Sequence, residues 1–112
     1  MEPDRYLKQL LLYLLVFSRG AEMRVRMVLA LAERPRNSNQ LARELGVDYK
    51  AIQHHLRVML QNRLVQRPME GAYGALYFLS PSMEEHLEYV KGIWKRYGKS
   101  QKKAGASVGG SS

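Results

Sequence analysis

Apolar residues recur at helical spacing through most of the chain and predict a mainly helical fold. Pro3 and Asp4 are typical of a helix start, and the continuous apolar run Leu10–Phe17 extends that helix to its own end. A second amphipathic helix is expected over about Ala21–Glu33, and Pro35 ends it. The first third of the chain is therefore expected to form two helices.

The middle of the chain predicts a short helix, a tight turn and a longer helix. Asn37 and Gln40 have the spacing of a capping box at the start of the short helix, Ser38–Leu45. Gly46 can adopt the left-handed backbone that ends a helix. The longer helix, Asp48–Asn62, begins with a capping aspartate, and its apolar residues share one face: Ile52, Leu56, Met59 and Leu60.

Two short β-like stretches follow and predict a hairpin over residues 64–79. They are Leu64–Met69 and Ala75–Leu79, and the loop between them contains two glycines. Pro68 has no N–H to donate to a strand ladder, so we expect it at an edge or a bulge.

The pattern after the hairpin predicts one more helix, over residues 81–97, and then a disordered tail, 98–112. The helix carries a heptad-like apolar seam: Met83, Leu87, Val90, Trp94 and Tyr97. From Gly98 the composition shifts to Gly, Ser, Lys and Ala. We therefore expect an N-terminal helix (1–18), a central domain (19–80), a C-terminal helix (81–97) and the tail.

The charge of the chain is concentrated in the central domain. The formal net charge is +8, and the sequence pI is about 10.0. Residues 19–67 contain ten Lys and Arg against four Asp and Glu, which is +6 of that total. A concentrated positive charge favours a polyanionic partner such as nucleic acid.

The order of the elements is typical of a winged helix-turn-helix with extra N- and C-terminal helices. In such a fold the longer helix can enter the DNA major groove, and the hairpin forms a wing that reaches the neighbouring backbone. Lys50 and Arg57 can bind phosphate or guanine, and Gln53 can pair with both major-groove atoms of adenine. Tyr49 and His54 can contact phosphate or a thymine methyl. With two wing residues added, the candidate DNA-binding residues are Tyr49, Lys50, Gln53, His54, Arg57, Arg67 and Tyr73.

Residues 39–79 resemble the prokaryotic winged helix regulators of the ArsR-like type, especially their archaeal relatives. The resemblance is carried by Leu41-Ala42, Leu45-Gly46-Val47, Ile52, His55-Leu56, Leu64-Val65 and Tyr77-Leu79. It implies a dimeric repressor or activator that binds double-stranded DNA. Carried onto this sequence, it also implies that five of the candidate residues face the groove: Tyr49, Lys50, Gln53, His54 and Arg57.

The chain departs from this family's pattern at two places. Metal-sensing members carry cysteines near the third helix, and this chain has none, so we expect neither metal nor cofactor. Adjacent helical histidines such as His54 and His55 point about 100° apart and cannot easily chelate one ion. Asn62-Arg63 stands where Asn-Gly is usual, and we expect Asn62 to take the left-handed conformation.

The flanking helices are more apolar than a compact winged core requires. We therefore expect a homodimer that pairs through the N- and C-terminal helices. Such a dimer would place two recognition helices about 34 Å apart, one turn of B-DNA. Whether a small-molecule effector binds is left open, because no set of residues indicates one.

The sequence contains no catalytic constellation, so we do not expect an enzyme: it has no phosphate-binding glycine loop and no nucleophile beside a base. The apolar run is shorter than the roughly 20 residues of a membrane-spanning helix, so the expected location is the cytoplasm, on the nucleoid, with membrane-surface attachment a minor alternative. Two further functions stay open: a winged-helix protein-interaction module, and a chromatin-like architectural protein with little sequence preference.

Overall fold

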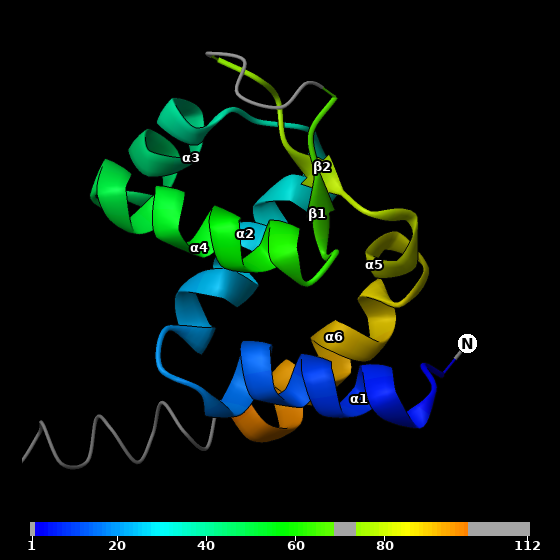
Figure 1. Cartoon of the computed structure of the whole chain (residues 1–112). Helices are drawn as coiled ribbons and strands as arrows, with labels where there is room; N and C mark the ends of the chain where they lie inside the picture. The colour runs from blue at the N-terminus through cyan, green and yellow to red at the C-terminus, as the bar shows by residue number, and fades with distance from the viewer. Residues whose placement is uncertain (1, 69–73, 99–112) are drawn as a thin grey trace, which may run out of the picture. The chain divides into compact units, whose positions relative to one another are not determined.

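The computed structural model describes residues 2–68 and 74–98 (Figure 1). The chain divides into two compact units. The winged unit is Arg26–Glu85, and the flanking unit combines the residues up to Val25 with those from His86 onward. The sequence-based division of the chain into segments 1–18, 19–80, 81–97 and 98–112 stays a prediction.

The helices of the winged unit follow the sequence pattern closely. α2 (Ala21–Glu33) belongs to this unit from Arg26 onward, and α3 (Ser38–Leu45) and α4 (Tyr49–Gln61) come next. α4 packs against α3 and against the first strand of the wing. The core of the unit buries the predicted inner faces of these helices, with Leu41, Ile52, Leu56 and Met59 at most 1% exposed. A mainly helical winged helix-turn-helix is therefore confirmed.

The wing is a two-stranded antiparallel sheet that is shorter than predicted. β1 (Val65–Gln66) pairs with β2 (Phe78–Leu79), in the register Val65 with Leu79. A further backbone bridge joins Arg36 to Tyr77. Pro68 lies two residues beyond β1, outside the regular pairing, where its lack of an N–H costs no ladder hydrogen bond.

The first helix of the flanking unit changes its geometry halfway. α1 (Arg5–Leu12) starts at Asp4, whose carboxylate accepts a hydrogen bond of 2.8 Å from the N–H of Leu7. The chain then continues as a π-helical turn, Tyr13–Phe17, instead of the regular α-helix that was predicted. This turn buries the apolar run against its own unit: Leu11, Leu14, Leu15 and Val16 are at most 5% exposed.

A buried arginine of α2 closes this π-helical turn. The Arg24 guanidinium donates hydrogen bonds to the carbonyl of Leu14 (2.7 Å), the hydroxyl of Ser18 (2.5 Å) and the carbonyl of Arg19 (3.0 Å). The two carbonyl acceptors lie near the end of the first helix, where carbonyl groups lack intrahelical partners. Burial lowers the pKa of the Arg24 guanidinium, while the nearby Tyr13 raises it.

The helix predicted over 81–97 is divided into three pieces. α5 (Pro81–Glu85) packs on β2 within the winged unit, and α6 (Leu87–Ile93) belongs to the flanking unit. His86 lies between them with a non-helical backbone (φ −107°, ψ 18°). A second π-helical turn, Trp94–Gly98, follows, so Gly98 belongs to this turn, and the rest of the predicted tail lies outside the described residues.

Candidate nucleic-acid interface

Local capping interactions position α4 relative to α3. The capping box of α3 is present, with both Asn37–Gln40 hydrogen bonds at 2.8 Å. Gly46 has the left-handed φ of 66° that turns the chain, and the Asp48 carboxylate then accepts from the N–H of Lys50 (3.0 Å). These predicted signals are all confirmed, and they orient α4 with its apolar face inward.

The opposite face of α4 is polar and open to solvent. Tyr49 is 41% exposed, and Lys50, His54 and Arg57 are exposed as well. Lys50, His54 and Arg57 follow one another at spacings of four and three residues, which places them on one side of the helix, and Tyr49 precedes Lys50 directly. Gln53 lies among them and is half-buried. We call these five residues the polar face of α4.

Gln53 is held in place by two hydroxyl groups. Its side-chain nitrogen, Nε2, donates hydrogen bonds to Oγ of Ser38 (2.9 Å) and to the hydroxyl oxygen of Tyr49 (2.7 Å). Ser38 is the first residue of α3 and was not among the predicted site residues. The tight turn brings the start of α3 beside α4, a contact across 15 residues that helical periodicity within α4 does not reveal.

Arg67, the wing candidate that lies within the described residues, lies against an aromatic ring. It is half-buried, it donates a hydrogen bond to the Tyr77 hydroxyl (3.1 Å), and its guanidinium lies 5.8 Å from the centre of that ring. Together with Gln53 and Arg57 it lines a small depression between α4 and the wing. The remaining candidate, Tyr73, lies outside the described residues.

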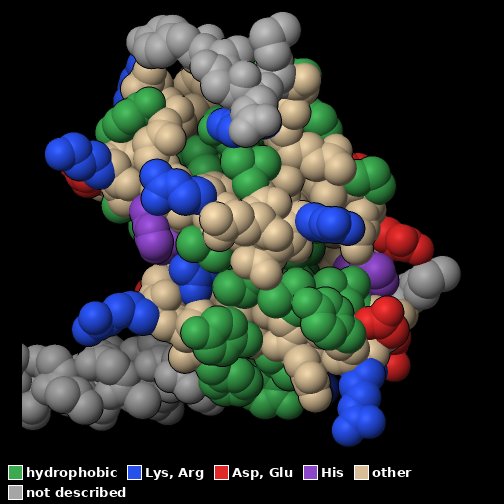
Figure 2. Space-filling model, viewed as in Figure 1, with side chains coloured by type: hydrophobic (Ala, Val, Ile, Leu, Met, Phe, Trp, Pro, Cys, Tyr) green, Lys and Arg blue, Asp and Glu red, His purple; other side chains and the backbone are tan. Residues whose placement is uncertain are grey.

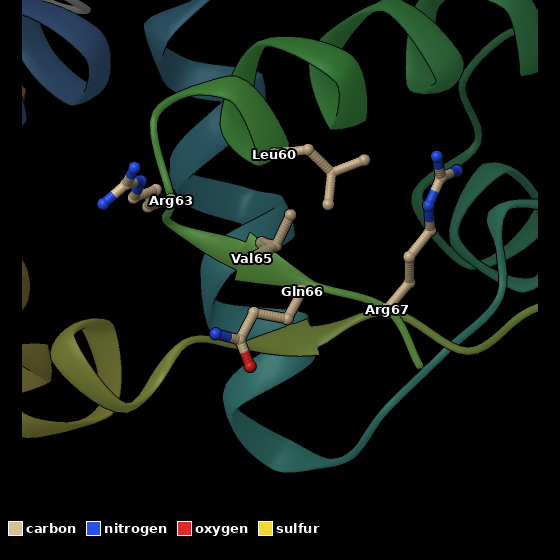
Figure 3. A pocket seen from close by; sticks show the side chains of 5 residues that line it. All are labelled: Leu60, Arg63, Val65, Gln66 and Arg67. Carbon is tan, nitrogen blue, oxygen red and sulfur yellow. The ribbon is translucent and has the colours of Figure 1, made fainter. Parts of the chain in front are cut away.

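A larger groove of about 560 Å³ lies beside the end of α4 and β1 (Figure 3). Leu60 and Val65 point toward one another inside it, and Arg63 and Arg67 extend at its opposite ends. Arg63 has a positive φ of 60°, so it takes the left-handed position. The expectation for Asn62 was wrong: Asn62 stays at φ −98°, where its side-chain amide donates to the Val58 carbonyl (2.9 Å).

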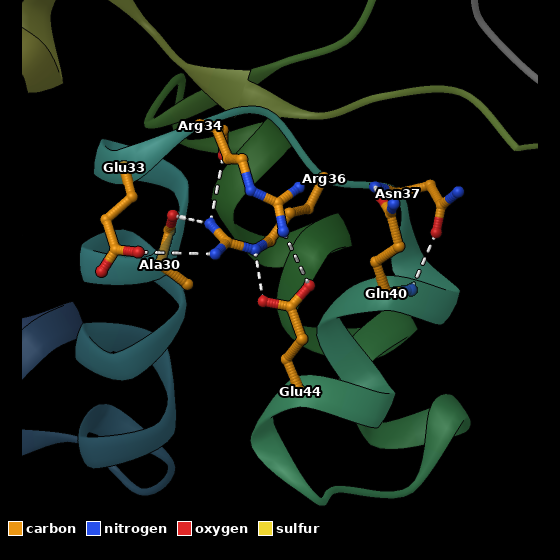
Figure 4. A network of polar contacts seen from close by, with 7 residues as sticks. All are labelled: Ala30, Glu33, Arg34, Arg36, Asn37, Gln40 and Glu44. Carbon is orange, nitrogen blue, oxygen red and sulfur yellow. Dashed lines mark hydrogen bonds and ion pairs between the residues drawn. The ribbon is translucent and has the colours of Figure 1, made fainter.

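Arg36 anchors the wing to the helices and contributes little to the surface charge (Figure 4). It is 5% exposed, and its guanidinium donates to the Glu44 carboxylate (2.7 Å) and to the Ala30 carbonyl. Its backbone exchanges hydrogen bonds of 2.8 and 3.1 Å with Tyr77. Arg24 is also buried, so two of the positive charges counted in residues 19–67 lie in the interior and not on the surface.

The described residues contain no group of three or more His, Cys, Asp or Glu side chains that could hold a metal ion. The rings of His54 and His55 lie 5.6 Å apart and are tilted by 58°. Within the same residues, no helix is long and apolar enough to cross a membrane.

The family model described as "Bacterial regulatory protein, arsR family" matches residues 22–67 of the chain. This segment contains most of α2, all of α3 and α4, and β1. No curated protein sequence matches the chain.

Several solved structures share the fold. The structure of Rv0081 from M. tuberculosis is 22% identical, covers 86% of this chain and 93% of its own, and has a TM-score of 0.62. The transcriptional repressor BigR from Xylella fastidiosa is 17% identical, with 85% and 87% covered and a TM-score of 0.62. Lactococcus lactis ZitR in complex with DNA is 11% identical, with 93% and 80% covered and a TM-score of 0.56.

Proposed function

We propose that this chain is a DNA-binding winged helix-turn-helix transcription regulator of the ArsR family, and that α4 is its recognition helix. α4 would lie in the major groove with its polar face toward the bases, and the wing would lie on the neighbouring backbone. Regulators of this family are not enzymes, which agrees with the absence of a catalytic constellation in the sequence.

The observation that carries this proposal is the polar face of α4. Two of its side chains, Lys50 and Arg57, are exposed cations, and Gln53 between them is held in one orientation. Cations would supply the phosphate contacts that give most of the affinity, and the amide would read a base edge. Ser38 and Tyr49 support the amide, and Arg67 extends the cationic surface toward the wing.

We further propose that the protein binds as a homodimer through its flanking unit. Large aromatic side chains stay exposed there although most of the apolar run is buried: Tyr6 is 74%, Tyr13 62% and Phe17 55% exposed. Phe17 packs against Tyr97, with ring centres 5.9 Å apart. We call these four residues the aromatic face. Figure 2 shows hydrophobic side chains gathered over α1 and the turn after it, and such a patch marks an association site.

The seam predicted along the last helix contributes less to this surface. Met83 and Val90 are at most 1% exposed, so they are already buried within the chain. Tyr97 is the seam residue that reaches the aromatic face. The proposed dimer therefore depends more on α1 and the turn after it than on α6.

Gel-shift measurements on a duplex selected from random DNA would test the role of α4. The double variant Lys50→Ala/Arg57→Ala should lose about 100-fold or more in affinity, because it removes two cations from the proposed interface. The matched control, Arg5→Ala/Lys95→Ala, removes two exposed cations from the flanking unit and should bind within about threefold of wild type. Equal losses in the two variants would remove α4 from the interface, and equal binding of selected and random DNA would favour an architectural protein.

A further inference from the structure

The hydrogen bonds around Gln53 leave its amide with one free polar atom. A primary amide nitrogen carries two N–H groups, and Nε2 of Gln53 makes two hydrogen bonds, to Ser38 and Tyr49. Both donors are therefore in use. The carbonyl oxygen, Oε1, is the atom that remains to contact DNA.

We infer that Gln53 reads a base as an acceptor only, which rests on the proposed placement of α4 in the major groove. In that groove the exposed donors are the N6 amino group of adenine and the N4 amino group of cytosine. Gln53 would thus select a base that carries an amino group. This revises the sequence-based expectation of a two-bond pair with adenine, because that pair also needs a free N–H for N7.

Ser38 and Tyr49 act as positioning residues in this arrangement. Each hydroxyl oxygen accepts a hydrogen bond from Gln53, so each hydroxyl hydrogen is directed elsewhere. The 41% exposed Tyr49 can then donate to a phosphate oxygen or to an acceptor on a neighbouring base. The two hydroxyls also restrict the rotamers of Gln53 before DNA binds, which lowers the entropy cost of the contact.

Base analogues in a duplex selected by the wild-type chain test this directly. At the base pair that Gln53 reads, purine in place of adenine, or 2-pyrimidinone in place of cytosine, removes the amino group. This change should weaken wild-type binding about two- to tenfold. Replacing adenine by 7-deazaadenine removes N7 alone and should leave the affinity unchanged. Gln53→Ala should be insensitive to both changes, whereas Gln61→Ala, an exposed glutamine about 12 Å further along α4, should respond as wild type does.

A gain of sensitivity separates positioning from a merely structural role. In Ser38→Ala/Tyr49→Phe both N–H groups of Gln53 become free, so this variant should become sensitive to 7-deazaadenine. Loss of packing would weaken binding to every duplex equally. Wild-type binding that depends on N7, or a Gln53→Ala variant with unchanged base preference, would overturn the inference. Failure of the wild-type chain to enrich any DNA would instead overturn the proposed function.

Discussion

The two units of this chain expose helix faces of opposite chemistry. α4 in the winged unit presents a tyrosine, a lysine, a histidine and an arginine around a fixed amide, whereas the first helix of the flanking unit presents aromatic rings. Both helices bury a continuous apolar side, so they differ in the side chains that each exposes to a partner. A polar face suits a hydrated polyanion, and an aromatic face suits another protein surface.

Ionic strength should separate the two faces most strongly. Raising NaCl from about 50 to 200 mM should weaken DNA binding by about 10³-fold, as expected for six or more phosphate contacts. Self-association through the aromatic face should change by less than about twofold, because salt hardly screens apolar contacts. Gel shifts and sedimentation equilibrium over the same salt series measure both. A dimer that dissociates in parallel with the DNA complex would show that charge holds it together.

Replacing Arg36 should show that this buried charge stabilises the winged unit and is not part of the polar face of α4. Arg36→Ala should lower the free energy of unfolding by about 2–4 kcal/mol, since it leaves the Glu44 carboxylate without its closest partner and frees the Ala30 carbonyl. Arg34→Ala removes a more exposed partner of the same carboxylate, 3.6 Å away, and should cost less than about 1 kcal/mol. Chemical denaturation measures both, and equal costs would contradict an anchoring role for Arg36.

Charges on the aromatic face should dissociate the dimer without unfolding the chain. Tyr13→Glu/Phe17→Glu should yield monomers and weaken the apparent DNA affinity by about 100-fold, because two linked binding sites become separate ones. Light scattering gives the mass, and gel shifts give the affinity. Lys50→Ala/Arg57→Ala should stay dimeric in the same assay. A Tyr13→Glu/Phe17→Glu variant that keeps its mass and affinity would place the association surface elsewhere.

Arg63 should show where the polar face ends. Arg63→Gly should raise the free energy of unfolding by about 0.5–1 kcal/mol, since glycine adopts a φ of 60° without steric cost. Asn62→Gly, one residue earlier, should lower it, because φ is negative there and the Val58 hydrogen bond is lost. Thermal unfolding measures both variants. A clear loss of DNA affinity in Arg63→Gly would extend the interface to the groove at the end of α4.

The parts of the fold that were predictable from sequence are those set by neighbouring residues. The capping box at Asn37, the turn at Gly46 and the cap at Asp48 each act within a few positions, so the boundaries of α3 and α4 followed from the pattern. The prediction of one long last helix was wrong because the apolar seam continues past His86, although the backbone leaves the helical region there.

The contacts that complete the site join distant segments and could not be read from periodicity. Ser38 reaches Gln53 across the turn, and Arg36 pairs with Tyr77 only after the chain has returned through the wing. The left-handed residue was misassigned for a different reason. The position is set by the geometry of the helix end, which places it at Arg63 although asparagine tolerates this conformation better.

The packing of Trp94 on Gly98 gives the flanking unit an optical reporter of its own. A methyl group on Gly98 would collide with the indole, so this contact requires glycine. Trp94 is the one tryptophan of the chain. Its emission therefore reports on the flanking unit, and the winged unit contributes no indole signal of its own.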